Sequence, residues 1–318
     1  MEWQQPTRLE PGMTLGVVAP SSQPLEWSRV QRGLQVLERL GFRLELAAHV
    51  RDTYGYLAGR DGDRAADLLE MLERPDVDGV ICAGGGYGAM RTALAVDHTR
   101  LRALASVAPK PFVGFSDITV LHALLQRELG WITFYGPVLT TLGRATEYTL
   151  AAFRSALMEN APFEITPDPD DPYLETITPG HATGKIVGGC ISLIVSLLGT
   201  PWELDLRDAI FVFEDIHEQP YTIDRMLTQL LAAGQLQRCA GIVICELVDC
   251  GPKQPGNTFR LEQVFEDLIR PLGIPTLYRH GRHLATLPLG AEGELDATNQ
   301  RLRIVQPGVM ERTLLDRR

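Results

Sequence analysis

The residues best suited to chemistry lie in the stretch 110–127, KPFVGFSDITVLHALLQR. Residues 112–115 are predicted to end a short apolar strand, and from Asp117 onward apolar side chains recur at helical spacing. Ser116 stands at the joint, where a sharp strand-to-helix turn exposes a side chain and leaves the first helical N–H groups without partners. The pattern fits a nucleophilic serine. It fits a serine that only caps the helix at least as well.

A glycine-rich segment, Ala83-Gly84-Gly85-Gly86-Tyr87-Gly88, follows the predicted strand 77–82 and precedes a helix from Ala89. Such turns often hold an anion on backbone N–H groups. The segment has neither the Gly-Lys-Ser/Thr of a phosphate-binding loop nor the context of a dinucleotide fingerprint. A tight turn, a nucleotide site and an oxyanion hole therefore all remain open. In an open sheet this segment and Ser116 would lie at the same edge.

Candidate partners for a nucleophile come from the second half of the chain. Glu214 follows the buried apolar run 209–213, and His280 and His283 occupy a basic, glycine-containing loop. Ser116, Glu214 and a histidine on three loops would supply a nucleophile, an orienting acid and a base. Three unrelated loop residues would give the same pattern.

Composition limits the possible functions of the 318-residue chain. Its net charge of −10 disfavours nucleic acid or an anionic membrane as a partner. The beginning of the chain lacks the basic and apolar regions of a signal peptide, and no apolar run is long enough to span a bilayer. The five cysteines lie mostly in apolar runs without metal-ligand spacing, which favours reduced thiols, a cytoplasmic protein, no metal and no cofactor.

The predicted elements that would position these residues fall into two α/β domains. Strands and helices alternate over residues 1–150, which predicts an open, Rossmann-like parallel sheet with helices on both faces. Residues 151–180 are rich in Pro and Asp near the sequence PDPDDPY and are interpreted as a linker. Residues 181–318 are expected to form a mixed α/β domain that ends in a hairpin over 293–305.

The chain resembles the LD-carboxypeptidases, also called muramoyltetrapeptide carboxypeptidases, which are serine peptidases of murein recycling. The resemblance runs from Gly16 to Gly290 and rests on ordered blocks that are more specific than any single motif. They are GVVAPSS, GYLAGRDGDRAADL, ICAGGGYGAMR, GFSDITVLH with YGPV, GGCISLIVSLLGT, VFEDIHEQPYTIDRML and HGRHLATLPLG. The stretch before His280 is shorter than in the family pattern, and Gly84 and Cys190 replace the family's usual Arg and Asn.

The resemblance implies a two-domain fold, the second domain partly barrel-like, and a catalytic triad. Ser116 matches the nucleophile, Glu214 the residue that orients the base, and His280 the base, because it precedes Pro288 at the family's spacing. The family's oxyanion hole matches the backbone N–H groups of Asp117 and of Gly85 or Gly86.

The implied reaction is hydrolysis of the amide between the L-centre of a dibasic residue and a terminal D-Ala in murein tetrapeptides. A small murein peptide substrate and a homodimer are further expectations from the family. Three alternatives stay open. They are a microcin-C-type immunity peptidase of the same fold, a non-catalytic binding module, and a nucleotide-binding domain that uses residues 84–88.

Overall fold

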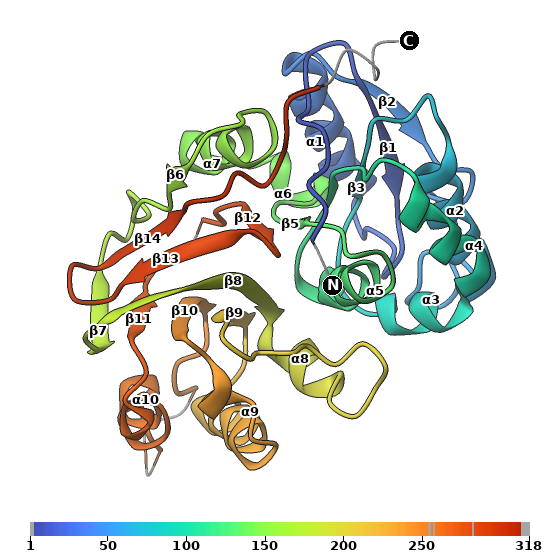
Figure 1. Cartoon of the computed structure of the whole chain (residues 1–318). Coiled ribbons are helices and arrows are strands. Elements are labelled where there is room, and N and C mark those ends of the chain that lie inside the picture. The colour runs from blue at the N-terminus through green and yellow to red at the C-terminus, as the bar shows by residue number, and fades with distance from the viewer. Residues whose placement is uncertain (1–2, 254–255, 257, 282, 313–318) are drawn as a thin grey trace. The chain divides into compact units, whose positions relative to one another are not determined.

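The computed structural model describes residues 3–253, 256, 258–281 and 283–312 of the chain. The chain forms two compact units (Figure 1). The first comprises Met1–Ala161, Ala285–Gly290 and Pro307–Arg318, and the second comprises Pro162–Leu284 and Ala291–Gln306. Within the described residues, none of the helices has both the length and the hydrophobicity needed to cross a membrane.

The first unit contains a six-stranded sheet in the order β12-β5-β4-β3-β1-β2 (Figure 1). Five neighbouring strands are parallel, as expected, and β12 is added antiparallel at one edge. The central strands are almost completely buried, because helices cover both faces. The strands are β1 (Thr14–Val18), β2 (Arg43–Leu46), β3 (Gly79–Cys82), β4 (Phe112–Gly114), β5 (Thr133–Tyr135) and β12 (Leu287–Leu289).

The helices of the first unit fall into packed groups, in which α1 contacts α6 while α2 contacts α3 and α3 contacts α5. Gly33 permits the first contact, because a Cβ there would collide with the carbonyl oxygen of Leu139 in α6. The helices are α1 (Trp27–Arg39), α2 (Asp61–Glu73), α3 (Ala89–Ala95), α4 (His98–Ala103), α5 (Thr119–Leu129), α6 (Leu139–Leu142) and α7 (Glu147–Leu157), with 3₁₀ turns η1 (Leu104–Ser106) and η2 (Ser116–Ile118).

The second unit contains an eight-stranded mixed sheet in the order β6-β14-β13-β8-β9-β10-β11-β7. Strands β8 to β11 are parallel, and the other neighbours are antiparallel. The strands are β6 (Phe163–Glu164), β7 (Leu174–Thr178), β8 (His181–Cys190), β9 (Ile210–Ile216), β10 (Gly241–Val248), β11 (Thr276–Arg279), β13 (Glu292–Asp296) and β14 (Arg301–Ile304).

This sheet curls toward a barrel. The evidence is that edge strand β7 reaches the turn of the β13–β14 hairpin. The Thr176 hydroxyl in β7 donates to the carbonyl oxygen of Ala297 at 2.7 Å, and the Gln300 amide donates to the carbonyl oxygen of Leu174 at 3.1 Å. The partly barrel-like second domain and the C-terminal hairpin expected from the sequence are both confirmed.

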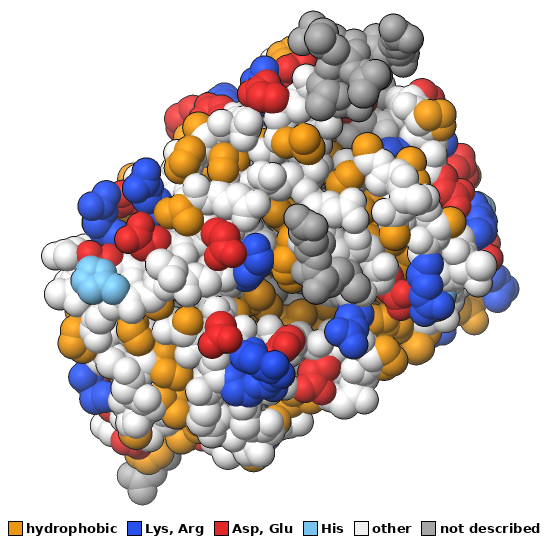
Figure 2. All heavy atoms as spheres, viewed as in Figure 1, with side chains coloured by type: hydrophobic (Ala, Val, Ile, Leu, Met, Phe, Trp, Pro, Cys, Tyr) orange, Lys and Arg blue, Asp and Glu red, His pale blue; other side chains and the backbone are white. Residues whose placement is uncertain are grey.

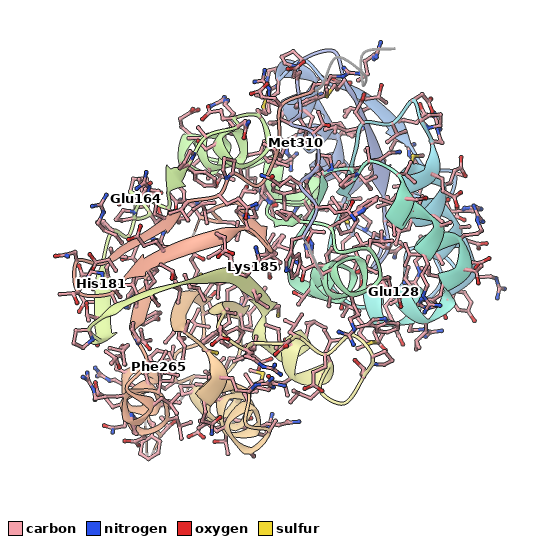
Figure 3. All side chains as sticks on the ribbon, in the orientation of Figure 1. Glu128, Glu164, His181, Lys185, Phe265 and Met310 are labelled. Carbon is pink, nitrogen blue, oxygen red and sulfur yellow. The ribbon has the colours of Figure 1, made fainter. Side chains whose placement is uncertain are left out.

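Helices α8 (Ile191–Ser196), α9 (Pro220–Ala232) and α10 (Leu261–Leu268) cover one face of the second sheet. Their apolar side chains share a core with Phe211 and Phe213 of β9, and Phe265 of α10 is fully buried in it (Figure 3). Successive residues of a strand point to opposite faces. Glu214 therefore points away from this helical layer. The 3₁₀ turns of this unit are η3 (Leu236–Arg238) and η4 (Arg270–Leu272).

The two units divide the chain differently from the expected boundaries of 1–150, 151–180 and 181–318. The expected linker holds the end of α7 and the edge strands β6 and β7, and residues 285–290 return to the first unit, where they include β12. Short edge strands form few ladder hydrogen bonds and tolerate proline. Their composition therefore resembles that of a linker.

Charged side chains of both signs are interspersed on the face that Figure 2 shows, with hydrophobic side chains between them. Some ion pairs join neighbouring strands, such as Lys185 of β8 with Glu292 of β13 at 3.0 Å. On this face the acidic excess is not gathered into a single patch.

Candidate active site

Ser116 occupies a strained strand-to-helix turn between β4 and α5. Its φ of 62° lies in the left-handed region, which a residue with a side chain adopts only at a cost. The N-cap positions belong to Phe115 for η2 and Ile118 for α5, and neither has a side-chain capping bond. The interpretation of Ser116 as a helix cap is therefore wrong. Its hydroxyl has no hydrogen-bond partner within the described parts of the chain.

Three buried groups hold the backbone around this turn. The Ser116 N–H donates to the Tyr135 hydroxyl at 2.9 Å, and the Ser116 carbonyl accepts from the Thr119 hydroxyl at 2.7 Å. One turn further along α5, His122 Nε2 lies 2.9 Å from the carbonyl oxygen of Gly114. Burial lowers the pKa of His122 to about 4, so the ring is neutral near pH 7 and donates from Nε2. His122 thus packs beneath the turn and holds the carbonyl oxygen of Gly114.

The glycine-rich segment lies directly against the serine turn. A Cβ placed on Gly85 would lie 3.3 Å from Cβ of Ser116 and 3.6 Å from the backbone nitrogen of Asp117. Gly86 has φ of +105° and would bring a Cβ within 2.7 Å of the Ser22 hydroxyl. The structure therefore brings together the backbone segments predicted to form the oxyanion hole, and a side chain on Gly85 would crowd the serine turn.

A buried guanidinium joins the glycine-rich segment to neighbouring loops. Arg64 of α2 is 1% exposed, and its Nη1 lies 3.3 Å from the carbonyl oxygens of Pro20, Ser21 and Gly88. Its Nη2 pairs with Asp61. Arg64 was not predicted to have a role. The only signal in the sequence that could have pointed to Arg64 was its charge, within a helix whose other side chains are partly apolar and buried.

The side chain of Asp117 also supports the site, although only its backbone was singled out from the sequence. Its Oδ2 accepts from the Ser21 hydroxyl at 2.6 Å and from the N–H of Ala89, the first residue of α3, at 2.7 Å. Burial raises the pKa of Asp117, although these hydrogen bonds oppose the rise. One carboxyl group thus connects the residue after Ser116 with two adjoining loops.

Glu214 and Asp215 lie side by side on β9 in the second unit and have different surroundings. Asp215 Oδ2 accepts from the Ser192 N–H at 3.0 Å and from Cys190 Sγ at 3.4 Å. Asp215 therefore caps the N-terminus of α8. Glu214 is 7% exposed and points to the opposite face of the sheet. The two neighbouring acids thus have distinct roles.

A β-bulge on β10 lies opposite Glu214. The pairing shifts between Ile244 and Leu247, so that Cys245 and Glu246 both face Glu214. Bulges of this kind redirect side chains and are frequent beside active sites. Glu246 is buried, and a Cβ on Gly281, the residue after His280, would lie 3.1 Å from its Cγ. The sequence did not single out Glu246, because a bulge has no clear signature in an apolar run.

His280 is held between two tyrosine rings at the end of β11. The ring centroids of Tyr278 and Tyr173 lie 4.1 Å and 4.7 Å from that of His280, and the His280 N–H donates to the Tyr173 carbonyl at 3.1 Å. Phe265 of α10 packs edge-on against Tyr278, with ring centroids 5.2 Å apart. His280 Nε2 is buried without a hydrogen-bond partner among the described residues.

His283, the weaker candidate for the base, is already paired. Its Nε2 lies 2.6 Å from Asp170 Oδ2, and its backbone N–H donates to Asp168 Oδ2 at 2.9 Å. Asp168 is fully buried and also accepts from the Asp170 N–H at 3.0 Å. These bonds fix the loop after His280. The structure thus gives His283 a carboxylate partner in Asp170.

Among the residues that the structure describes, two groups of side chains lie close enough together to hold a metal ion, although the sequence predicts no metal. One contains His49, Asp52 and Asp63, and the other contains Asp168, Asp170 and His283. In both groups the histidine is hydrogen-bonded to a carboxylate, which for His49 is Asp67 at 2.8 Å. In the second group this bond, His283 to Asp170, lies within the group itself.

The fold and the arrangement of Ser116 and the glycine-rich segment define a class of protein. Residues 15–136 match the family model for the LD-carboxypeptidase N-terminal domain, and residues 183–295 match that for the LD-carboxypeptidase C-terminal domain. The chain therefore belongs to the LD-carboxypeptidase family and is a carboxypeptidase.

Relatives of this family match nearly the whole chain. The "Probable murein peptide carboxypeptidase" of Bacillus subtilis (strain 168) is 38% identical over 317 residues, which cover 98% of this chain and 97% of the relative. The crystal structure of a muramoyltetrapeptide carboxypeptidase from Oxalobacter formigenes has a TM-score of 0.76 at 27% identity and covers 92% and 97% of the two chains. The wild-type microcin C7 self-immunity protein MccF shares the fold, with a TM-score of 0.86 at 22% identity over 96% and 99% of the chains.

Proposed function

We propose that this carboxypeptidase uses Ser116 to hydrolyse the amide between the L-centre of a dibasic residue and the terminal D-Ala of a murein tetrapeptide. The observation that carries the proposal is the strained Ser116 turn, with its unpaired hydroxyl, beside Gly85. The names of the relatives from Bacillus subtilis and Oxalobacter formigenes support a murein peptide as substrate.

In the proposed first step, His280 Nε2 removes the proton of the Ser116 hydroxyl while Oγ attacks the scissile carbonyl. The backbone N–H groups of Asp117 and of Gly85 or Gly86 would stabilise the oxyanion. Each such donor typically lowers a barrier by about 2.7–4 kcal/mol. The protonated His280 then gives its proton to the leaving amine of D-Ala, which leaves an acyl-enzyme on Ser116.

In the second step, His280 removes a proton from water, and the hydroxide attacks the acyl carbonyl. Collapse of this second tetrahedral intermediate returns the proton to Ser116 Oγ and releases the tripeptide. Glu214 would orient the imidazole and offset its positive charge. The steps consume one water and need no metal or cofactor.

The direct test measures D-Ala release from a murein tetrapeptide by the wild type, by Ser116→Ala and by Ser106→Ala. Ser106 is an exposed serine of the same unit whose hydroxyl donates to the nearby carbonyl oxygen of Ala103 at 2.9 Å. We expect Ser116→Ala to lose essentially all activity at an unchanged melting temperature, and Ser106→Ala to match the wild type. Wild-type activity in Ser116→Ala would refute the serine mechanism.

The same preparation separates the alternatives left open by the sequence. A microcin-type peptidase would cleave an aminoacyl nucleotide in preference to the tetrapeptide. A binding module would bind the tetrapeptide without releasing D-Ala, and a nucleotide-binding domain would bind a nucleotide without cleaving either compound. We also expect a cytoplasmic homodimer, which light scattering and fractionation of cells would test.

A further inference from the structure

The backbone N–H of Ser116 falls just beyond the regular hydrogen bonding of its sheet. Strand β4 pairs with β5 through Gly114 and Tyr135, and the Gly136 N–H donates to the Gly114 carbonyl at 3.0 Å. After that bond the chain turns away, with φ of 62° at Ser116. A buried N–H without a partner is costly, and a strained residue persists only where its surroundings hold it.

The Tyr135 hydroxyl takes the place of the missing strand partner. It accepts from the Ser116 N–H at 2.9 Å, and the side chain is only 2% exposed. The ring is fixed by Phe115, edge-on at 6.3 Å between centroids, and by His122 at 5.8 Å. The packed ring therefore holds the hydroxyl in a fixed position on strand β5. The hydroxyl contacts the backbone of the residue that we propose as the nucleophile.

We propose that Tyr135 is a positioning residue that keeps Ser116 in the strained conformation required for attack. The hydrogen bond also holds the Ser116 amide away from the oxyanion. This leaves the amides of Asp117 and the glycine-rich segment to stabilise the charge. The inference rests on the proposed function only in taking Ser116 as the nucleophile. Tyr135 itself touches neither the substrate nor the reacting atoms and acts through the backbone of Ser116.

The test is Tyr135→Phe, which keeps the ring contacts and removes only the hydroxyl. Active sites are counted by titration with a fluorophosphonate that labels nucleophilic serines. We expect kcat per titrated site to fall about 10- to 100-fold, or about 1.4–2.7 kcal/mol at 1.36 kcal/mol per tenfold, with KM within about twofold of the wild type. The rate of phosphonylation of Ser116 should fall by a similar factor.

The matched control is Thr133→Val on the same strand. Thr133 is fully buried and accepts a hydrogen bond from the Gln126 amide at 3.2 Å, so the variant also loses a buried hydroxyl bond. We expect its melting temperature to fall at least as far as that of Tyr135→Phe, while kcat per titrated site stays near the wild-type value. An equal loss of kcat in the two variants would show that any nearby destabilisation suffices, and would overturn the proposal.

Two further outcomes keep the inference testable. An unchanged kcat per site and an unchanged phosphonylation rate in Tyr135→Phe would refute it. If that variant does not fold, 3-fluorotyrosine at position 135 preserves the shape and weakens the acceptor. A reduced kcat would then support the proposal and a wild-type kcat would refute it. A wild type that is phosphonylated at Ser116 yet releases no D-Ala would refute only the proposed substrate, and the phosphonylation rates would still test Tyr135.

Discussion

Replacing each of the adjacent acids Glu214 and Asp215 in turn would separate a catalytic role from a structural one. The two side chains point to opposite faces of β9. Asp215 caps α8 through Ser192 N–H and Cys190 Sγ, whereas Glu214 lies opposite the bulge on β10. We therefore expect Glu214→Gln to impair activity without unfolding, and Asp215→Ala to impair stability with little loss of kcat in the folded protein.

The expected magnitudes follow from these contacts. Removing an N-cap side chain costs about 0.5–2 kcal/mol, and the buried position of Asp215 favours the upper half of that range. At about 2–4 °C per kcal/mol for a domain of this size, Asp215→Ala should melt about 2–8 °C lower. Asp215→Asn keeps an acceptor oxygen for Ser192 and should lose less. For Glu214→Gln, the analogous acid-to-amide change in a Ser-His-Asp triad lowers kcat by about 10⁴, so we expect a loss of several orders of magnitude.

The assay is D-Ala release from the tetrapeptide at temperatures well below every melting transition, with thermal melts of all three variants. The His280 imidazolium that Glu214 would stabilise forms only during reaction, so the loss in Glu214→Gln should fall on kcat more than on KM. A folded, inactive Asp215→Asn together with an active Glu214→Gln would refute the assignment of the orienting acid.

Two other predictions follow from the surroundings of the base. His280→Ala should lower kcat by about 10²-fold or more, as loss of a general base does. His283→Ala should lose only the loop contact with Asp170 and lower kcat a few-fold. The reverse ranking in the same D-Ala assay would make His283 the base. Burial raises the pKa of Glu246 above its ordinary 4.5, so its charged form destabilises the folded state and wild-type stability falls as pH rises through the folded pKa. Glu246→Gln should therefore have the same free energy of unfolding in urea as the wild type below about pH 4.5, and a higher one as the pH rises above that value. A stability advantage of Glu246→Gln that shrinks with rising pH would contradict this.

The sequence predicted the parallel sheet and the serine turn, because their signals are local. The apolar run ending at Phe115 and the helical period after Asp117 locate the turn, and the glycine-rich segment after β3 lies against it as expected from the topology. The sequence could not predict that Leu287–Leu289 returns to β5 as strand β12. Its Pro288 is compatible with an edge strand, but a short run with a proline has no strand signature.

The supporting residues escaped prediction for a different reason. Tyr135, Arg64 and Asp215 each bond a backbone group of another segment of the chain. Apolar packing would also explain the position of Tyr135, and an ordinary helix that of Arg64. A one-dimensional pattern shows that such a residue is buried or amphipathic, but not which distant N–H or carbonyl it satisfies. The roles of Ser116, Glu214 and His280 remain predictions for the same reason, since they require three-dimensional pairing.

The irregular backbone explains why the candidate residues lie where they do. A regular strand uses its N–H and C=O groups in the ladder, so a site that needs backbone donors or a redirected side chain must form where the ladder fails. In the first unit this happens at Ser116, where the turn leaves an N–H that Tyr135 satisfies. In the second unit it happens opposite Glu214, where the bulge places Cys245 and Glu246 against one residue. In both units the candidate residue therefore stands at the interruption itself, Ser116 in the turn and Glu214 opposite the bulge, where the backbone is not committed to a regular ladder.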